Sequence, residues 1–174
     1  VKQMIELEMI FYKNNKIKKS RLWKIPVLYG GKFGPDLENI AKIKNLTVNQ
    51  IIKKHTSKRL EIIIMGFLPG LGYMSGLDAD LELPRRLNPR ISVPKGSVGI
   101  AIGQTVIYPL NSPGGWNLIG RTPINLFDPT KNDPILFRPG DFVDFYSINE
   151  EEFNYINKLN SNESNLYKSQ EIIK

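Results

Sequence analysis

The chain of 174 residues contains no cysteine and a single histidine, His55. The lack of cysteine excludes a disulfide framework, a catalytic thiolate and a cysteine metal site. One histidine excludes a site built from several histidines, so we expect no metal centre. No run of eighteen apolar residues occurs, and the sequence predicts no membrane span. The N-terminus lacks the pattern of a signal peptide, which favours a cytoplasmic protein. It also lacks an initiator methionine, so we expect a further segment upstream.

Familiar nucleotide and hydrolase motifs are missing as well. The chain has no G-x-x-x-x-G-K-[ST] phosphate loop, no G-x-G-x-x-G fingerprint and no G-x-S-x-G nucleophile elbow. We therefore expect this chain alone to bind no cofactor. His55 falls near the C-terminal end of a predicted helix, where the helix dipole favours a cation. The alternative is a general base, and His55 is the candidate catalytic residue.

Positive charge exceeds negative charge, with 24 Lys and Arg against 17 Asp and Glu. Six of these cations lie between Lys13 and Lys24 with no acid among them. Such a run is typical of a solvated linker, and a nucleic-acid patch is the sharper alternative. Residues 36–45 and 46–55 could form a helix-turn-helix, but capping uses the polar residues that would read bases. We expect no nucleic-acid partner.

The coarse pattern indicates a mainly β domain with two short helices. One helix opens at Pro35 and Asp36 and ends near Lys44, with Asn45 as its C-cap. The next begins with a capping box of Thr47 and Gln50. Predicted strands cover Lys24–Tyr29, Leu60–Met65, Ser97–Ile102, Gln104–Tyr108, Asn117–Arg121 and Phe142–Ser147. Five or more short strands separated by Gly-rich and Pro-rich loops favour a barrel or sandwich. A helix is expected at Glu150–Leu159, followed by a frayed tail.

The stretch from Gly66 to Asp128 is dense in glycine, proline and arginine, which favours a rigid surface site for a small anion. Arginine forks match carboxylate or phosphate groups, and Arg85, Arg86 and Arg90 lie beside prolines. Ordinary surface salt bridges are the alternative. In the run Ser112–Trp116, glycines let backbone N–H groups approach an anion, and Trp116 is a binding wall or a barrel plug.

Arg121 follows Gly120 and is the expected principal anion ligand, with Arg90 as the other candidate. Gln104 or Tyr108 would orient the anion. The full set of predicted substrate-binding residues is Arg85, Arg90, Gln104, Tyr108, Ser112, Gly114, Gly115, Trp116 and Arg121. The loops Gly66–Tyr73 and Ser112–Arg121 carry aromatic side chains that favour interfaces. The predicted partner-interface residues are Phe67, Pro69 and Tyr73.

Several motifs together resemble one known family. They are IPVLYGGKFGPDL (Ile25–Leu37), the helix ending in His55, GFLPGLGYM (Gly66–Met74), LPRRLNPRISVPKGSVGIAIGQTVIYP (Leu83–Pro109), SPGGWNLIGRTP (Ser112–Pro123) and LFD (Leu126–Asp128). From Lys24 to about Ile148, the chain resembles the B-type subunits of 5-oxoprolinase. This family also contains a sporulation-kinase inhibitor and the first-subunit part of allophanate hydrolase, and it includes carboxyltransferase regions of urea carboxylase. One departure is Leu71-Gly72-Tyr73, where the family usually has Phe-Pro-Tyr.

The resemblance implies a cyclophilin-like β-barrel domain over residues 24–148. Residues 1–23 would be the end of an upstream α/β domain and a basic linker, and residues 149–174 a C-terminal helix and polar tail. It also implies a non-autonomous subunit of a 5-oxoprolinase, which converts 5-oxoproline to glutamate with ATP used by the assembled complex. The implied partners are a related barrel subunit of the C type and a TIM-barrel-like subunit of the A type. A histidine-kinase inhibitor and half of a biotin-dependent urea carboxyltransferase are the alternatives.

Overall fold

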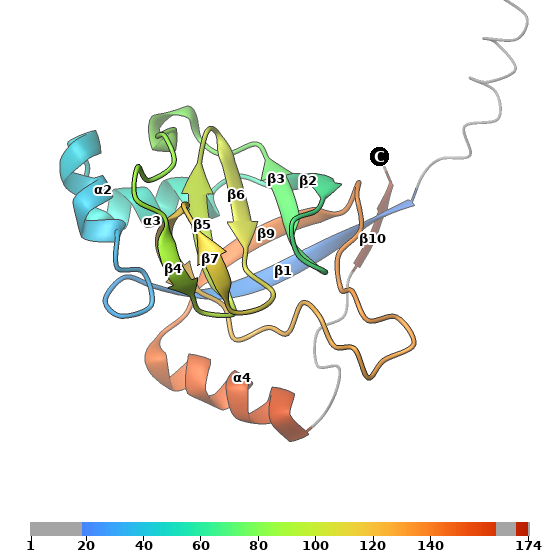
Figure 1. Cartoon of the computed structure of the whole chain (residues 1–174). Helices are drawn as coiled ribbons and strands as arrows, with labels where there is room; N and C mark the ends of the chain where they lie inside the picture. The colour runs from blue at the N-terminus through green and yellow to red at the C-terminus, as the bar shows by residue number, and fades with distance from the viewer. Residues whose placement is uncertain (1–18, 163–169, 174) are drawn as a thin grey trace, which may run out of the picture.

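Seven strands close into a barrel in the computed structural model, which describes residues 19–162 and 170–173 (Figure 1). Around the barrel the order is β1 (Lys19–Tyr29), β8 (Asn117–Arg121), β5 (Ser97–Ala101), β6 (Gln104–Ile107), β3 (Gly72–Ser75), β2 (Leu60–Met65) and β9 (Phe142–Ser147). The barrel closes where β9 pairs with β1 in parallel. This confirms the predicted mainly β barrel.

The first strand is longer than the sequence predicted. It begins at Lys19 rather than Lys24, inside the segment expected to be a basic linker. The residues Leu22–Val27 pair with β9, and Trp23, Ile25 and Val27 alternate into the core with at most 5% exposure. Because alternate buried residues define a strand face, this half of the predicted linker is part of the barrel wall. The upstream remnant predicted at the N-terminus lies outside the described residues.

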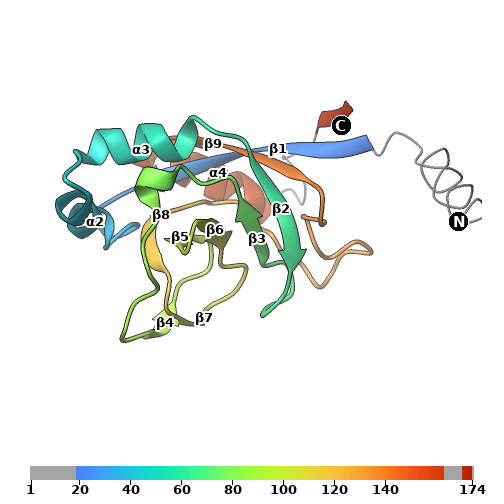
Figure 2. The same ribbon diagram turned by 90° about the horizontal axis from the view of Figure 1, so that it is seen from above.

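Two short helices cover one end of the barrel, α2 (Leu37–Lys44) and α3 (Val48–Thr56) (Figure 2). Asn45 ends α2 in the left-handed conformation, and Thr47 and Gln50 form the predicted capping box at the start of α3. Leu37, Ile40 and Ile51 are almost fully buried and join the barrel core. Each such side chain contributes about 1.5–3 kcal/mol of burial free energy. Capping and burial together explain why these helices match the sequence pattern.

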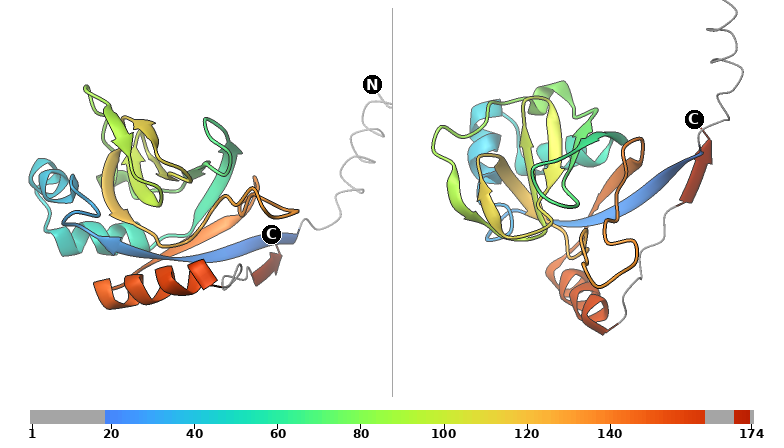
Figure 3. Two further views of the ribbon diagram at one scale, coloured as in Figure 1. Left: turned by 60° about the horizontal axis from the view of Figure 1, so that its bottom comes forward. Right: turned by 45° about the vertical axis from the view of Figure 1, so that its right-hand side comes forward.

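A two-stranded ribbon stands beside the barrel rather than within it. It consists of β4 (Arg90–Val93) and β7 (Ser112–Gly114), which pair antiparallel. The ribbon and the β2–β3 hairpin rise on the same side of the molecule, while α4 (Glu150–Asn162) lies across β1 on the other side (Figures 2 and 3). The sequence did not predict β3, β4 or β7, and it also missed the 3₁₀ turn at Ala79–Leu81.

Two apolar clusters share the barrel wall. The larger fills the interior and includes Ile100, Ile107 and Ile119. The smaller lies on the outer face of the same strands, because the alternate residues Ala101, Val106, Tyr108 and Leu118 point the other way. Strand β5 is therefore buried along its whole length. The ribbon covers the outer cluster through Val93, and this arrangement creates the candidate site.

The C-terminal part also differs from expectation. Helix α4 runs to Asn162, three residues beyond the predicted end at Leu159, and Phe153 packs on Phe33 with ring centroids 5.0 Å apart. The predicted frayed tail contains a further strand, β10 (Gln170–Ile173), which pairs antiparallel with Lys19–Leu22 of β1. Backbone pairing with an early strand is a long-range event that a polar local sequence does not reveal.

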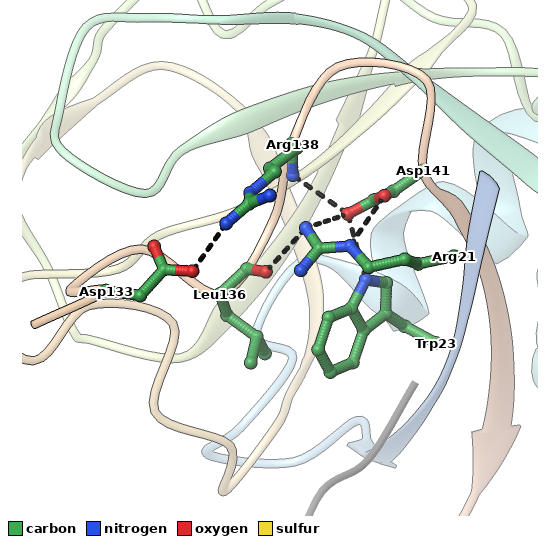
Figure 4. A network of polar contacts seen from close by, with 6 residues as sticks. All are labelled: Arg21, Trp23, Asp133, Leu136, Arg138 and Asp141. Carbon is green, nitrogen blue, oxygen red and sulfur yellow. Dashed lines mark hydrogen bonds and ion pairs between the residues drawn. The ribbon is translucent and has the colours of Figure 1, made fainter. Parts of the chain in front are cut away.

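A buried carboxylate ties the start of β9 to β1 (Figure 4). Asp141 is 4% exposed and accepts two hydrogen bonds from Arg21, at 3.0 and 2.6 Å, and one from Trp23 Nε1 at 3.0 Å. The backbone N–H of Arg138 also donates to it. Arg21 further donates to the Leu136 carbonyl. This cluster anchors the long connection between β8 and β9 to the barrel.

Candidate binding pocket

A pocket of about 430 Å³ lies between the outer barrel wall, the ribbon and the segment before β4. Its walls are mostly aromatic side chains, prolines and bare glycine backbone. They are formed by Phe67, Tyr73, Arg85, Pro89, Ile102, Tyr108, Pro113, Gly114, Gly115 and Trp116. Of the predicted substrate residues, Arg85, Tyr108, Gly114, Gly115 and Trp116 are therefore brought together.

The aromatic wall depends on glycines. Trp116 is 6% exposed, and its ring lies 6.0 Å from that of Tyr73. A Cβ on Gly99, in the strand behind, would approach the Cβ of Trp116 to 2.8 Å. A side chain on Gly114 would collide with the Tyr108 hydroxyl group. Trp116 thus forms a wall on the outside of the barrel, and it does not plug the barrel interior.

Tyr108 contributes a phenol group to the pocket lining. The side chain is 1% exposed, and burial raises the pKa of its hydroxyl group. A hydrogen bond with the Trp116 backbone and the nearby Arg85 cation lower that pKa in part. The hydroxyl group is therefore neutral at physiological pH and able to donate a hydrogen bond to a bound anion.

Arg85 is the charged side chain of the pocket lining. Its Nε and Nη2 atoms lie over Gly115, since a Cβ built on that glycine would be 3.6 Å from each. Within residues 19–162 and 170–173 we find no hydrogen bond or ion pair to its guanidinium group. A guanidinium group that faces a pocket without a protein carboxylate is suited to bind an anionic ligand.

The neighbouring arginines are engaged elsewhere. Arg86 Nη1 and Arg90 Nη2 both donate to Asp36 Oδ1, at 2.9 and 2.7 Å. Asp36 is buried, with 6% exposure. The prediction that Arg90 binds the substrate anion stays untested, but its guanidinium group already has a buried carboxylate partner and does not line the pocket.

Arg121 does not line the pocket either, although the sequence made it the principal anion ligand. It ends β8 at the opposite end from Asn117, the neighbour of Trp116, and pairs in register with Leu28 and Ser97. Its guanidinium carbon lies 5.4 Å from the centroid of the Phe33 ring. Burial lowers its pKa from the usual value. Arg121 therefore packs against Phe33, outside the pocket lining.

His55, the predicted catalytic residue, lies in the core and away from the pocket lining. It is 1% exposed, with Nδ1 2.7 Å from the Tyr29 hydroxyl group and Nε2 3.3 Å from Thr105 Oγ1. Its ring also stacks near Phe145, with centroids 4.6 Å apart. Burial lowers the pKa of His55 to about 3 and raises that of Tyr29. These contacts favour a neutral, structural histidine over a general base, and His55 does not line the pocket.

The remaining predicted residues differ in their relation to the pocket. Gln104 begins β6 beyond the pocket lining, and Ser112 Oγ donates to the Pro113 carbonyl at 3.2 Å. Of the predicted interface residues, Phe67 and Tyr73 line this pocket, while Pro69 lines a second one of about 420 Å³. The departure at Leu71 is structural, since Leu71 is 2% exposed and packs in the outer cluster.

Two apolar residues at the pocket mouth adopt unfavourable backbone conformations. Phe67 has φ 68° at the centre of a γ-turn, in which the Leu68 N–H donates to the Gly66 carbonyl at 2.9 Å. Ile102 has φ 43° in the tight turn between β5 and β6. Positive φ is rare for a β-branched residue. Both side chains remain more than half exposed, at 65% and 57%. Strain of this kind clusters at functional sites.

The described ranges offer no group of three or more His, Cys, Asp or Glu residues placed to hold a metal ion. They also contain no helix that is long and apolar enough to cross a membrane. Ile102, Pro89 and Pro113 line the pocket although the sequence did not predict them there, and Asp36 was expected only to start a helix. The signal that could have drawn attention to Asp36 is the motif FGPDL, which contains it.

Fold and pocket together define a cyclophilin-like barrel domain with a pocket on its outer wall. The chain belongs to the family described as carboxyltransferase domain, subdomain C and D, whose model matches residues 1–137. It is 47% identical over 133 residues to the B-type subunit of 5-oxoprolinase from Bacillus subtilis, covering 76% of this chain and 55% of that protein. The chain therefore spans about half the length of this relative. The resemblance predicted from the motifs is confirmed.

Solved structures agree on the fold. A conserved uncharacterized protein from Pyrococcus horikoshii is 43% identical with a TM-score of 0.73, over 86% of this chain and 66% of that one. Urea carboxylase from Kluyveromyces lactis has a TM-score of 0.77 over 99% of this chain and 18% of that one. At 22% identity, the second likeness shows the fold alone.

Proposed function

We propose that this protein is a B-type subunit of an ATP-dependent 5-oxoprolinase and that its pocket binds the substrate carboxylate. The observation that carries the proposal is Arg85, a guanidinium group without a carboxylate partner among the described residues, in an aromatic pocket. Similarity to the B-type subunit of the Bacillus subtilis 5-oxoprolinase supports the choice of substrate.

The chemistry of the pocket fits a small monoanion. A volume of about 430 Å³ suits a small ligand. Tyr73 and Trp116 offer apolar faces to a ring, and Arg85 can bind a carboxylate through two parallel hydrogen bonds. A nucleoside triphosphate such as ATP is bound by several cations or a metal ion. Among the residues that line this pocket, Arg85 alone carries a charge. This favours ATP binding by another subunit of the assembled enzyme.

Exposed apolar residues lie on the segments that form the pocket, and they suit a partner protein. They are Phe67, Leu87, Ile91 and Ile102, which are 65%, 98%, 92% and 57% exposed. Exposed apolar groups gathered near a pocket mark interaction sites. The proposed partner at these residues is the related barrel subunit, with the TIM-barrel-like subunit completing the enzyme.

The direct test is ATP hydrolysis that depends on 5-oxoproline, measured with this protein and both partner subunits combined. We expect turnover with 5-oxoproline and none with urea. Turnover with urea and bicarbonate in the presence of a biotin carboxylase, but not with 5-oxoproline, would contradict the proposal.

Two matched arginine variants locate the carboxylate site within the reconstituted enzyme. Arg85→Gln removes the pocket cation, and the loss of a charged hydrogen bond predicts a KM for 5-oxoproline raised roughly ten- to a hundredfold. Arg121→Gln removes the same kind of charged group from a residue that does not line the pocket. This variant should leave the KM for 5-oxoproline within about twofold of the parent value. The reverse result would move the site to Arg121, as the sequence suggested.

A further inference from the structure

Asp36 holds an unusual position for an acid at the start of a helix. It occupies the N-cap of α2, but its side chain makes no capping hydrogen bond. Asp36 Oδ2 instead accepts the backbone N–H of Leu118 at 2.6 Å, and its own N–H donates to the Leu118 carbonyl at 3.0 Å. The residue is therefore fastened to β8, next to the strand residues behind the pocket.

The other carboxylate oxygen joins Asp36 to the segment that carries the pocket cation. Asp36 Oδ1 accepts from Arg86 at 2.9 Å and from Arg90 at 2.7 Å, across 50 and 54 residues of sequence. These two arginines bracket most of the segment Leu83–Arg90, and Arg85 directly precedes the first of them. One buried carboxylate thus fixes two points of the chain beside Arg85.

After Arg85, the backbone of this segment is held at Arg86 and again at Arg90, which pairs with Gly114 in the ribbon. Upstream, the Leu83 carbonyl accepts from the Ile102 N–H at 2.7 Å, and the Pro84 carbonyl accepts from Asn117 Nδ2 at 2.9 Å. Downstream, the Arg86 N–H donates to the Gly115 carbonyl at 2.7 Å. Between Leu83 and Pro89 there is no helix or strand, and Leu87 is 98% exposed. The hydrogen bonds from Arg86 and Arg90 to Asp36 therefore anchor residues 86–90 through their side chains.

Because they are partly buried, the guanidinium groups of Arg86 and Arg90 depend on Asp36 for charge compensation. Arg86 Nε and Arg90 Nη1 are buried and make no hydrogen bond with the described residues. Two partly buried cations share one carboxylate, and removal of that charge leaves both without compensation. Loss of Asp36 should therefore release the segment toward solvent and carry Arg85 away from Gly115.

We propose that Asp36 is a positioning residue, which acts on substrate binding through Arg86, Arg90 and the segment that places Arg85. This inference rests on the proposed carboxylate site at Arg85. Asp36 itself does not line the pocket.

A double-mutant cycle in the reconstituted enzyme tests it. Asp36→Asn preserves side-chain volume and should raise the KM for 5-oxoproline about tenfold. In an Arg85→Gln background the same change should alter KM by less than about twofold, because it acts through Arg85. The matched control is Asp141→Asn, another buried acid with an arginine partner, whose effect on KM should be small in both backgrounds. Equal effects of Asp36→Asn in both backgrounds would overturn the proposal.

Hydrogen exchange of the protein gives a second readout that does not depend on activity. In Asp36→Asn, the Arg86 amide should exchange at least about tenfold faster, whereas amides of the β1–β9 pairing should keep their rates. Asp141→Asn should leave the Arg86 amide unchanged. If Arg85→Gln has no effect on KM, the proposed function fails, and the exchange result alone decides whether Asp36 fixes the segment. Unchanged exchange at Arg86 would refute the positioning role.

Discussion

Arg85 and Arg121 carry the same guanidinium group, yet the fold gives them different uses. Neither arginine has a carboxylate partner among the described residues, but Arg85 faces an aromatic pocket, whereas Arg121 lies against Phe33 and is partly buried. The difference arises from their places on the barrel, since Arg121 ends β8 while Arg85 lies on the segment before β4. Local sequence cannot distinguish them, because both arginines lie within two residues of a proline.

His55 should make the protein less stable in mild acid. Its folded pKa of about 3 is below the unfolded value of about 6.5, so the unfolded state binds the extra proton. Stability is therefore complete above pH 6.5 and falls by up to about 1.4 kcal/mol per pH unit below it. By pH 5 the loss should reach about 2 kcal/mol.

Urea unfolding at pH 7, 6 and 5 measures this effect. The variant His55→Gln is less stable at pH 7, because it disturbs contacts with Tyr29 and Thr105. Its deficit should shrink by about 2 kcal/mol at pH 5, since it has no imidazole to protonate. Parallel pH profiles for the two proteins would show that His55 is not kept neutral in the fold.

The sequence identified about half of the site. Tyr108, Gly114, Gly115 and Trp116 were predicted because turn chemistry and aromatic side chains gather in local motifs. The engagement of Arg90 was not predictable, because its partner Asp36 lies 54 residues away. Burial of His55 was equally hidden, since its contacts come from β1, β6 and β9.

At the scale of elements, the strand β5 shapes the pocket from behind. Gly99→Ala adds a methyl group that would lie 2.8 Å from the Cβ of Trp116. Because overpacking of this kind costs about 1–3 kcal/mol, we expect lower stability and a displaced Trp116 wall. The KM for 5-oxoproline should rise in the reconstituted enzyme, and the fluorescence of Trp116 should change.

Gly66→Ala is the matched control for this substitution. A Cβ on Gly66 meets no atom within 4 Å, and its φ is not positive. Its stability should stay within about 0.5 kcal/mol of the parent protein. If Gly99→Ala behaves like the control, the close contact between β5 and Trp116 does not shape the pocket.

Elements with strong local signals were predicted, and elements without them were not. Both helices follow their caps, and β2, β8 and β9 match the predicted ranges because apolar residues mark them. By contrast, β7 reads Ser-Pro-Gly and β3 begins with glycine, residues that favour turns. Their strand conformation depends on pairing with β4 and with β2 and β6.

The ribbon offers a test of the proposed partner surface. Ile91→Glu places a charge on a residue of β4 that is 92% exposed, so the free protein should keep its stability. At a desolvated interface the same charge is costly, and affinity for the related barrel subunit should fall at least tenfold, or about 1.4 kcal/mol. Ile43→Glu on α2, at a residue 63% exposed, is the control and should bind normally. Equal binding by both variants, measured by titration calorimetry, would place the interface elsewhere.

At the scale of the whole molecule, binding and chemistry should be separable. Arg85 and a neutral Tyr108 can hold a carboxylate, but the pocket lining contains no histidine and no carboxylate to move protons, and no set of cations for a triphosphate. We therefore expect the protein alone to bind 5-oxoproline weakly, in a manner abolished by Arg85→Gln, and to hydrolyse no ATP in response. Calorimetry and phosphate release, measured on the same preparation, check both halves. Hydrolysis should begin only when both partner subunits are added. Turnover by the single protein at the rate of the assembly would show that a complete catalytic set exists within it.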